Sequence, residues 1–311
     1  MIVRQLRPRP EYARLLPEKA RTFAFAARFL PEEERRAVTV LYAFCRVMDD
    51  LVDEPQPGSG QLAIREQLAA WRRWLAAGAA GDEPEPRELA RALREQVLRR
   101  HQVPVALLTT LLDGVESDLE PVRLPDFAAL RRYSLQVAGT VGLAMCHVLN
   151  ARQPETLNAA AELGIAMQLT NVLRDVGGDL RRDRIYLPAE ELRRFGYSEA
   201  RLRALAERGE GPDEDFRSLL RFQIARARGY CARGLVGVWT LPPRARPAIL
   251  AAGRLYRAIL DAIEGNGYDV LHRRATTSRL VKAREGLSAL VLARLWGNQT
   301  TVDYPAPSAV R

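Results

Sequence analysis

Apolar residues recur three to four positions apart along almost the whole chain, which is the period of an amphipathic α-helix. Alternating apolar and polar runs of strand length are missing. Clusters of proline and glycine, as at residues 55–60 and 78–86, mark the loops. With 311 residues, 47% of them hydrophobic, the chain can bury a sizeable core. We therefore predict an all-α protein with a single domain over residues 1–311, a core of about 15–295 and flexible termini.

The helical pattern has recognisable interruptions. The helix around Asp175 is expected to loosen at Gly177–Gly178, and residues 181–188 are expected to form an extended, basic lid. Small residues at 137–142 predict a bend or a close approach, for which dense helix packing is the ordinary explanation and a bound substrate chain the alternative. The expected helices span about residues 32–53, 62–77, 87–101, 105–119, 127–149, 155–179, 198–207, 213–238, 243–263 and 278–296.

One face of the helix that ends near residue 53 combines an aromatic, a basic and two acidic residues. At roughly 100° per residue, Tyr42, Arg46, Asp49 and Asp53 fall within a stripe about 60° wide. Carboxylates four residues apart are most often a solvated helix face that forms local ion pairs. This stripe alone therefore indicates a metal site only weakly.

A second stripe with the same chemistry lies far downstream. Gln168, Asn171, Asp175 and Asp179 share a face about 80° wide on the helix expected at 155–179. Magnesium prefers hard oxygen ligands and is usually held by one or two carboxylates together with substrate phosphate oxygens. Two such stripes facing each other would hold magnesium ions on a diphosphate and stabilise its charge as it leaves.

Composition excludes several other kinds of site. The net charge of +9 resides mostly on arginines spread along the chain, without the dense basic tract that favours nucleic acid. Three cysteines and three histidines have no paired spacing, which argues against disulfides, zinc and a Ser-His-Asp hydrolase. No stretch reaches the length of a membrane-spanning helix, and no secretory signal begins the chain. We expect a cytoplasmic protein, with a membrane surface as a peripheral partner and no nucleic acid.

The sequence resembles the squalene and phytoene synthase family of head-to-head prenyl transferases over about residues 15–295. The most specific matching segments are the two aspartate-rich motifs, Asp49–Asp53 and Asn171–Asp179, and the sequel Arg184-Ile185-Tyr186-Leu187-Pro188. Further matches are Arg21-Thr22-Phe23, residues 42–46, Tyr133 with 137–142, and Gln168–Asn171. Gly178 departs from the pattern, since relatives commonly have an acidic residue there.

This resemblance implies an isoprenoid-synthase helical bundle with a central active-site cavity, and a site that uses Mg²⁺, with Mn²⁺ as a substitute. It places the metal at Asp49, Asp53, Asn171, Asp175 and Asp179, with Asp50 in support. It assigns the diphosphate to Arg21, Arg46 and Arg273, although Arg274 sits beside the last of these; Arg174 on the same rim could also clamp its oxygens. The residues expected to line the reacting centre are Thr22, Phe23, Tyr42, Tyr133, Gln168 and Tyr186.

The resemblance also implies an activity. Local similarity at 176–188, and the small residues Ala24, Ala26 and Ala27, favour condensation of two geranylgeranyl diphosphates through a cyclopropylcarbinyl intermediate to phytoene, without NADPH. The alternative within the family is a fifteen-carbon synthase that makes presqualene diphosphate, dehydrosqualene or squalene. Two alternatives lie outside the family. One is a chain-elongating prenyl transferase or terpene cyclase, whose usual second motif we do not find. The other is a non-catalytic, membrane-associated helical partner protein.

Overall fold

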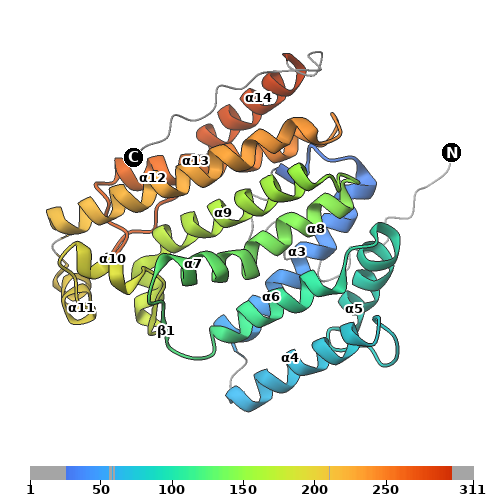
Figure 1. Ribbon diagram of the computed structural model, residues 1–311, viewed down its shortest axis with the longest axis horizontal. Coiled ribbons are helices and arrows are strands. Elements are labelled where there is room, and N and C mark those ends of the chain that lie inside the picture. Colours follow the sequence, from blue (N-terminus) through green and yellow to red (C-terminus); the bar gives the residue numbers. More distant parts are fainter. Residues whose placement is uncertain (1–25, 56–57, 59, 210, 296–311) are drawn as a thin grey trace.

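Helices make up almost the whole fold, as the periodicity predicts, in the computed structural model of the chain (Figure 1). The structure describes residues 26–55, 58, 60–209 and 211–295, so the predicted flexible termini lie outside it. The first half contains α3 (Glu32–Asp53), α4 (Gln61–Ala76), α5 (Arg87–Leu93), the π-helical turn η1 (Arg94–Arg99), α6 (Val105–Ser117), β1 (Val122–Arg123), α7 (Phe127–Ser134), the π-helical turn η2 (Leu135–Gly139) and α8 (Thr140–Val148). The second half contains α9 (Pro154–Arg181), β2 (Arg184–Ile185), α10 (Ala189–Arg194), α11 (Glu199–Arg208), α12 (Glu214–Val236), the 3-10 turn η3 (Gly237–Thr240), α13 (Arg246–Gly265) and α14 (Arg279–Leu295).

Local sequence explains where several helices begin and end. Helix α3 begins directly after Pro31 with three glutamates in its first turn, where negative charge suits the helix dipole. The side chain of Ser198 caps α11 and that of Asp213 caps α12, each accepting a hydrogen bond from a backbone N–H three residues on. Gly209 ends α11 with a φ of 71°, a conformation that glycine adopts without strain.

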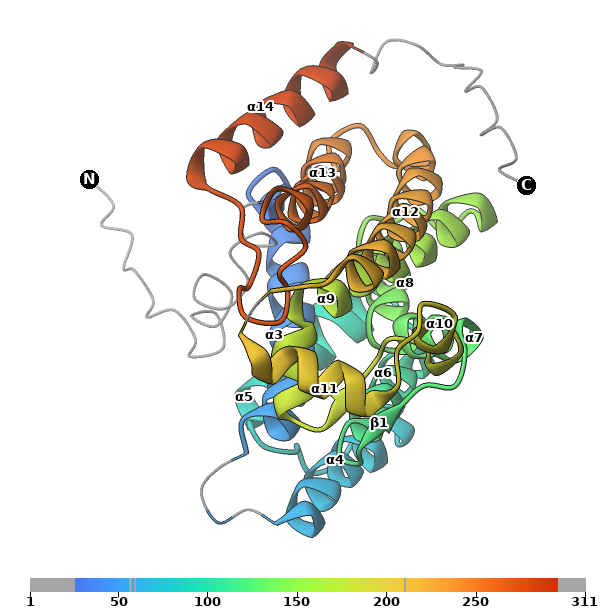
Figure 2. The same ribbon diagram turned by 90° about the vertical axis from the view of Figure 1, so that its left-hand side faces the viewer.

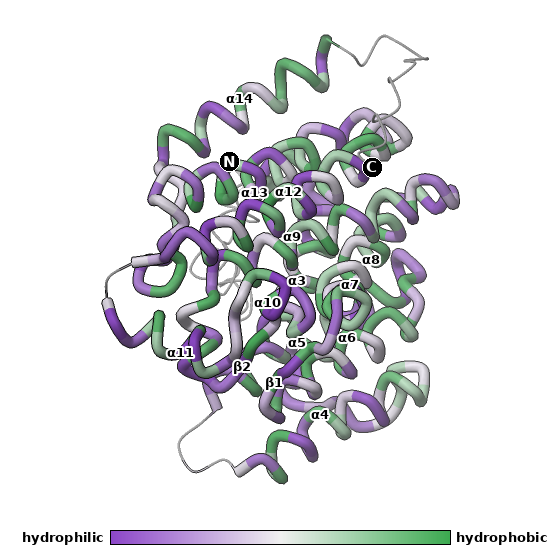
Figure 3. The backbone as a smooth tube through the Cα atoms, turned by 60° about the vertical axis from the view of Figure 1, so that its left-hand side comes forward, coloured by the Kyte–Doolittle hydropathy of each residue, from purple (hydrophilic) through white to green (hydrophobic). Residues whose placement is uncertain are grey.

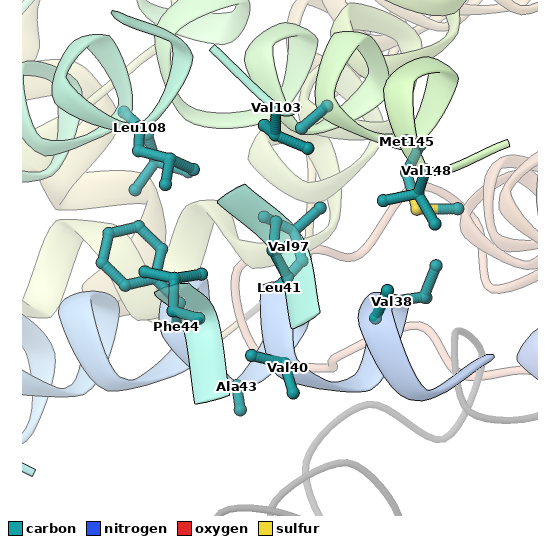
Figure 4. Packing of buried hydrophobic residues seen from close by; sticks show 14 of the residues in the cluster. Val38, Val40, Leu41, Ala43, Phe44, Val97, Val103, Leu108, Met145 and Val148 are labelled. Carbon is teal, nitrogen blue, oxygen red and sulfur yellow. The ribbon is translucent and has the colours of Figure 1, made fainter. Parts of the chain in front are cut away.

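Two large groups of buried apolar side chains hold the helices together. The first joins α3, α4, α5, α6 and α8; in Figure 4, Phe44 of α3 lies beside Leu108 of α6, and Val38 faces Met145 and Val148 of α8. The second surrounds α9 and joins it to α7, α10, α11, α12 and α13. Figure 3 shows hydrophobic and hydrophilic residues alternating along the same helices, the pattern expected when one face is buried.

Helix α9 runs through the middle of the bundle, with α8 on one side and α12 and α13 on the other (Figures 1 and 2). Small residues permit this close packing. A Cβ atom on Gly142 would lie 2.4 Å from the carbonyl oxygen of Ala160, and one on Gly164 would lie 2.5 Å from that of Ala138. Helix packing, the ordinary explanation for the small residues at 137–142, therefore accounts for Gly142.

The predicted loosening at Gly177–Gly178 is wrong, because α9 continues as a helix through both glycines to Arg181. The reason for Gly177 is tertiary. Its N–H lies 3.1 Å from the carbonyl oxygen of Val270, and an added Cβ would lie 1.9 Å from that of Leu271. A glycine is needed here so that the segment after α13 can cross the surface of α9.

The predicted helix at 127–149 also differs in detail. It is continuous but contains the π-helical turn η2, so the backbone widens over the first half of the small residues at 137–142. The extended segment predicted at 181–188 is shorter in the structure, because Arg181 still belongs to α9 and residues 182–183 form a turn. The extended part begins at Arg184, where β2 pairs in parallel with β1 and Val122 is opposite Arg184. Among the described residues, no helix is both long and apolar enough to cross a bilayer.

Candidate active site

A cavity of about 1070 Å³ is lined by residues of both core groups. Both predicted acidic stripes line it, one from α3 and the other from α9. The apolar part of the wall comes mainly from η2, α8, α9, η3 and α13. The volume lies at the upper end of the range for small-molecule sites, so the cavity can hold a long or a double substrate.

On α3, the two carboxylates of the stripe have different surroundings. Burial raises the pKa of Asp49 to about 7, and the neighbouring charge of Asp53 acts in the same direction. Asp53 is held by Arg184 of β2, whose guanidinium donates a hydrogen bond of 2.5 Å. Arg46, between Tyr42 and Asp49 on this face, pairs with Asp50, and its Nε atom is buried without a hydrogen-bond partner.

On α9, Asp175 is the carboxylate held by arginines. Arg174 and Arg274 approach it with shortest distances of 2.6 and 2.7 Å. Burial alone would raise the pKa of Asp175, but these hydrogen bonds lower it below its usual value. By contrast, burial and the charge of Asp175 raise the pKa of Asp179 to about 7. Asp53 adds to this increase, so the two acidic stripes interact across the cavity.

The donor set fits a hard cation. Asn171 donates to Gln168 at 3.3 Å, which leaves its Oδ1 atom buried without a partner. Together with the carboxylates of Asp49 and Asp179, this amide oxygen provides the hard oxygen ligands that Mg²⁺ prefers. Within the described residues, no three acidic, histidine or cysteine side chains already form a metal cluster. Substrate phosphate oxygens would have to supply the remaining ligands, which is how proteins usually bind Mg²⁺.

Two tyrosines share Asp118, which lines the cavity together with Tyr186, whereas Tyr133 does not belong to the cavity wall. Tyr133 and Tyr186 each donate a hydrogen bond of 2.7 Å to Asp118, and their rings stack with centroids 4.8 Å apart. Burial raises the pKa of Asp118 to about 6 although both hydrogen bonds oppose the shift. Both tyrosines were predicted as site residues from the sequence, whereas Asp118 was not. Its place at the C-terminal end of α6 was a usable signal, because a carboxylate there opposes the helix dipole.

A sequence model of the squalene/phytoene synthase family matches residues 16–281, most of the chain and all of this cavity's acidic residues. The chain belongs to the squalene/phytoene synthase family. This confirms the resemblance drawn from the two aspartate-rich motifs. Members of the family are prenyl transferases that use a divalent metal with prenyl diphosphates.

Relatives within the family carry specific names. A 15-cis-phytoene synthase of Synechococcus elongatus is 38% identical over 269 residues, covering 82% of this chain and 83% of its own. A phytoene synthase of Cereibacter sphaeroides is 36% identical over 273 residues, covering 84% and 73%. Among solved structures, a dehydrosqualene synthase matches with a TM-score of 0.79 and 25% identity, covering 91% of this chain and 95% of its own. The all-α isoprenoid-synthase fold is therefore confirmed.

The structure also places the remaining residues that the family resemblance proposed. Tyr42, Gln168 and Arg273 line the cavity. Arg273 is exposed and lies 3.8 Å from Asp269, whereas its neighbour Arg274 makes the close pair with Asp175. The assignment of Arg273 to diphosphate stays a prediction, with Arg274 the better oriented of the two. Three further predicted site residues lie outside the described residues: Arg21, Thr22 and Phe23.

The small residues that suggested a long substrate are only partly visible. Ala26 and Ala27 are buried in the core, and neither belongs to the cavity wall. Ala24 lies outside the described residues. These alanines therefore provide no structural measure of substrate length.

Proposed function

We propose that this protein condenses two molecules of geranylgeranyl diphosphate to phytoene in carotenoid biosynthesis. The observation that carries the proposal is the division of a single cavity into a polar and an apolar part. Both acidic stripes and their arginines form the polar part, and Val141, Met145 and Leu163 belong to the apolar part. A prenyl diphosphate has the same division, with a charged head and a long apolar chain.

In this proposal, Asp49, Asp53, Asn171, Asp175 and Asp179 hold magnesium. The bound metal would neutralise charge that develops on the departing diphosphate. Arg46, Arg174 and Arg274 are placed to orient the non-bridging diphosphate oxygens, because a guanidinium matches their geometry. Mn²⁺ could replace Mg²⁺, since it also accepts hard oxygen ligands.

The aromatic residues act on the apolar side of this head group. Tyr186 lines the cavity, and its ring stacks on Tyr133 while Asp118 accepts a hydrogen bond from each hydroxyl group. Held in this way, Tyr186 would help to keep the two substrate chains in register during bond formation and exclude water from the cation that forms.

The twenty-carbon substrate is favoured by the relatives. Named phytoene synthases are 36–38% identical to this chain, whereas the dehydrosqualene synthase structure is 25% identical. The second candidate is a fifteen-carbon head-to-head synthase, which the TM-score of 0.79 to that dehydrosqualene synthase supports. Both candidates would use the same acidic residues.

We also propose that residues 15–295 act as one catalytic domain at the membrane surface of the cytoplasm. Both core groups contribute walls to the same cavity, so the cavity would be incomplete with either group alone. A forty-carbon hydrocarbon would partition into a bilayer rather than into water.

The deciding experiment identifies the hydrocarbon made by the purified full-length protein. Protein and Mg²⁺ are incubated separately with geranylgeranyl or farnesyl diphosphate, each with and without NADPH. Phytoene from the twenty-carbon substrate, made without NADPH, is the expected result. A thirty-carbon product would overturn the substrate assignment, and a cyclic or elongated product would overturn the head-to-head reaction. No magnesium-dependent product from either substrate would favour the non-catalytic partner.

A further inference from the structure

Helix α14 covers the outside of α13 at the edge of the molecule in the views of Figures 1, 2 and 3. Its inner face is well packed. Gly286 and Ala289 are buried, and Glu285 accepts a hydrogen bond of 2.7 Å from Arg254 of α13. This inner face fixes which side chains of α14 point outward.

The outer face of α14 carries an apolar stripe that is interrupted by one exposed arginine, Arg284. The exposed fractions are 83% for Leu280, 65% for Leu287, 46% for Val291 and 66% for Leu295. At roughly 100° per residue, these four side chains fall within about 80° of the helix circumference. They are four of the six large hydrophobic residues that are exposed among the described residues. A stripe of this kind marks an interaction surface.

The exposed charge on the same helix has one sign. Its basic residues are Arg279, Lys282, Arg284 and Arg294, and its single acidic residue, Glu285, is buried and pairs with Arg254 and Arg284. A second copy of α14 would therefore bring like charges together around the leucines. An anionic surface would instead satisfy both the apolar stripe and its basic flanks, as in helices that lie in a membrane interface.

The position of α14 links this surface to the cavity. Ala289 packs in one cluster with Val238 and Ala252, and both of these residues also line the apolar part of the cavity. The segment that leads into α14 begins at the polar rim, where Arg274 and Thr276 line the cavity. Helix α14 therefore lies between the cavity wall and the outside.

We propose that the outer face of α14 docks on a membrane that contains anionic lipids, with Leu280, Leu287, Val291 and Leu295 inserted into the interface. The docked helix would turn toward the bilayer the side of the molecule where α13 forms part of the apolar cavity wall, so that an apolar product can be released into the membrane. The release role rests on the proposed function, whereas the docking itself depends only on the surface of α14.

Vesicle flotation of the purified full-length protein tests the docking. The probes are phosphatidylcholine vesicles with and without phosphatidylglycerol, at low and high salt. We expect binding to the anionic vesicles that weakens with salt. The triple variant Leu280→Ser/Leu287→Ser/Val291→Ser should lower the partition coefficient at least about tenfold, because each apolar side chain contributes to insertion. Leu62→Ser is the matched control: Leu62 is also 83% exposed but lies on α4, which Figure 1 places far from α14.

A second pair of variants and a mass measurement complete the test. Arg279→Gln/Arg294→Gln should reduce the preference for anionic vesicles severalfold. Equal flotation of the wild type and the triple variant would overturn the proposal. So would light scattering that shows a wild-type dimer converted to a monomer by the triple substitution, since the face would then bind a second copy. Turnover of the triple variant in detergent separates the docking hypothesis from the proposed function. A failure to make phytoene would count against the proposed function and would leave the flotation result for docking unchanged.

Discussion

Arg184 donates a hydrogen bond of 2.5 Å to Asp53, across 131 positions of sequence. The guanidinium side chain is only 9% exposed, and it reaches the acidic stripe of α3 from the short strand β2. The pairing of β2 with β1 therefore positions a cation against a residue proposed to bind metal. This contact gives the segment after α9 a specific part in the site.

Arg184→Gln should lower both stability and turnover. Removing Arg184 from this largely buried pair leaves Asp53 with only the more distant Arg182 as a cation, so we expect a loss of about 1–3 kcal/mol in the free energy of unfolding. Turnover should fall at least about tenfold as Asp53 loses its orientation. Denaturant unfolding and steady-state kinetics measure the two effects. The control is Arg182→Gln, because Arg182 is more exposed and lies 3.7 Å from Asp53; equal losses in both variants would contradict a specific role for Arg184.

Asp49→Asn and Asp175→Asn should each reduce kcat by about 10² to 10³, the range for removing one electrostatic stabiliser of a transition state. Product formation under saturating substrate and Mg²⁺ measures the effect. Asp113→Asn serves as the control, because Asp113 pairs with Arg72 on the surface of α6. Near-normal rates for both Asp49→Asn and Asp175→Asn would remove these residues from the proposed metal site.

Tyr186→Phe should lower kcat by at least about tenfold while the protein remains folded. The substitution keeps the ring stacked on Tyr133 but removes the hydroxyl group that donates to Asp118. Tyr197→Phe is a matched control, because Tyr197 also donates to an aspartate, Asp213, but does not line the cavity. Equal rates for the two variants would show that the hydroxyl group of Tyr186 has no part in catalysis.

Mg²⁺ should raise the melting temperature more at about pH 8 than at about pH 5.5. Burial raises the pKa of Asp49 and Asp179 to about 7, so the folded metal-free protein holds these protons more tightly than the unfolded chain. The contribution of these groups to stability is therefore greatest at low pH and falls as the pH rises toward 7. Magnesium requires the ionised carboxylates, and below pH 7 it must compete with protons.

Thermal scans with and without Mg²⁺ at both pH values measure this difference. In the double variant Asp49→Asn/Asp179→Asn, the magnesium-induced increase should be small at either pH. A wild-type increase that is as large at low pH as at high pH would show that these two carboxylates do not bind the metal.

Substitutions at the adjacent glycines of α9 should have opposite effects. Gly177→Ala should lower the free energy of unfolding by about 1–3 kcal/mol or more, because the added Cβ atom would collide with the backbone of Leu271. A Cβ atom on Gly178 would contact only the end of the Arg181 side chain, at 3.9 Å. Gly178→Ala should therefore raise the free energy of unfolding by about 0.5–1 kcal/mol through helix propensity. Denaturant unfolding distinguishes them, and destabilisation by Gly178→Ala would contradict the helical account of this position.

Periodicity predicted most of the helices. The helices expected at 32–53 and 198–207 begin within one residue of α3 and α11, because the dipole and capping interactions at Pro31 and Ser198 are local. The prediction from the sequence differed most from the structure at Gly177. Helix propensity suggested a loosened turn there, whereas the structure has an intact helix crossed by another segment.

The chain's own sequence determined its helical class, its family and the two acidic stripes, since each depends on residues close together along the chain. Only the tertiary structure brought Asp118 to Tyr133 and Tyr186, Arg184 to Asp53, and Arg274 to Asp175. These contacts join separate elements of the chain. Their geometry depends on how α6, α9, β2 and the segment before α14 pack, which no local spacing encodes.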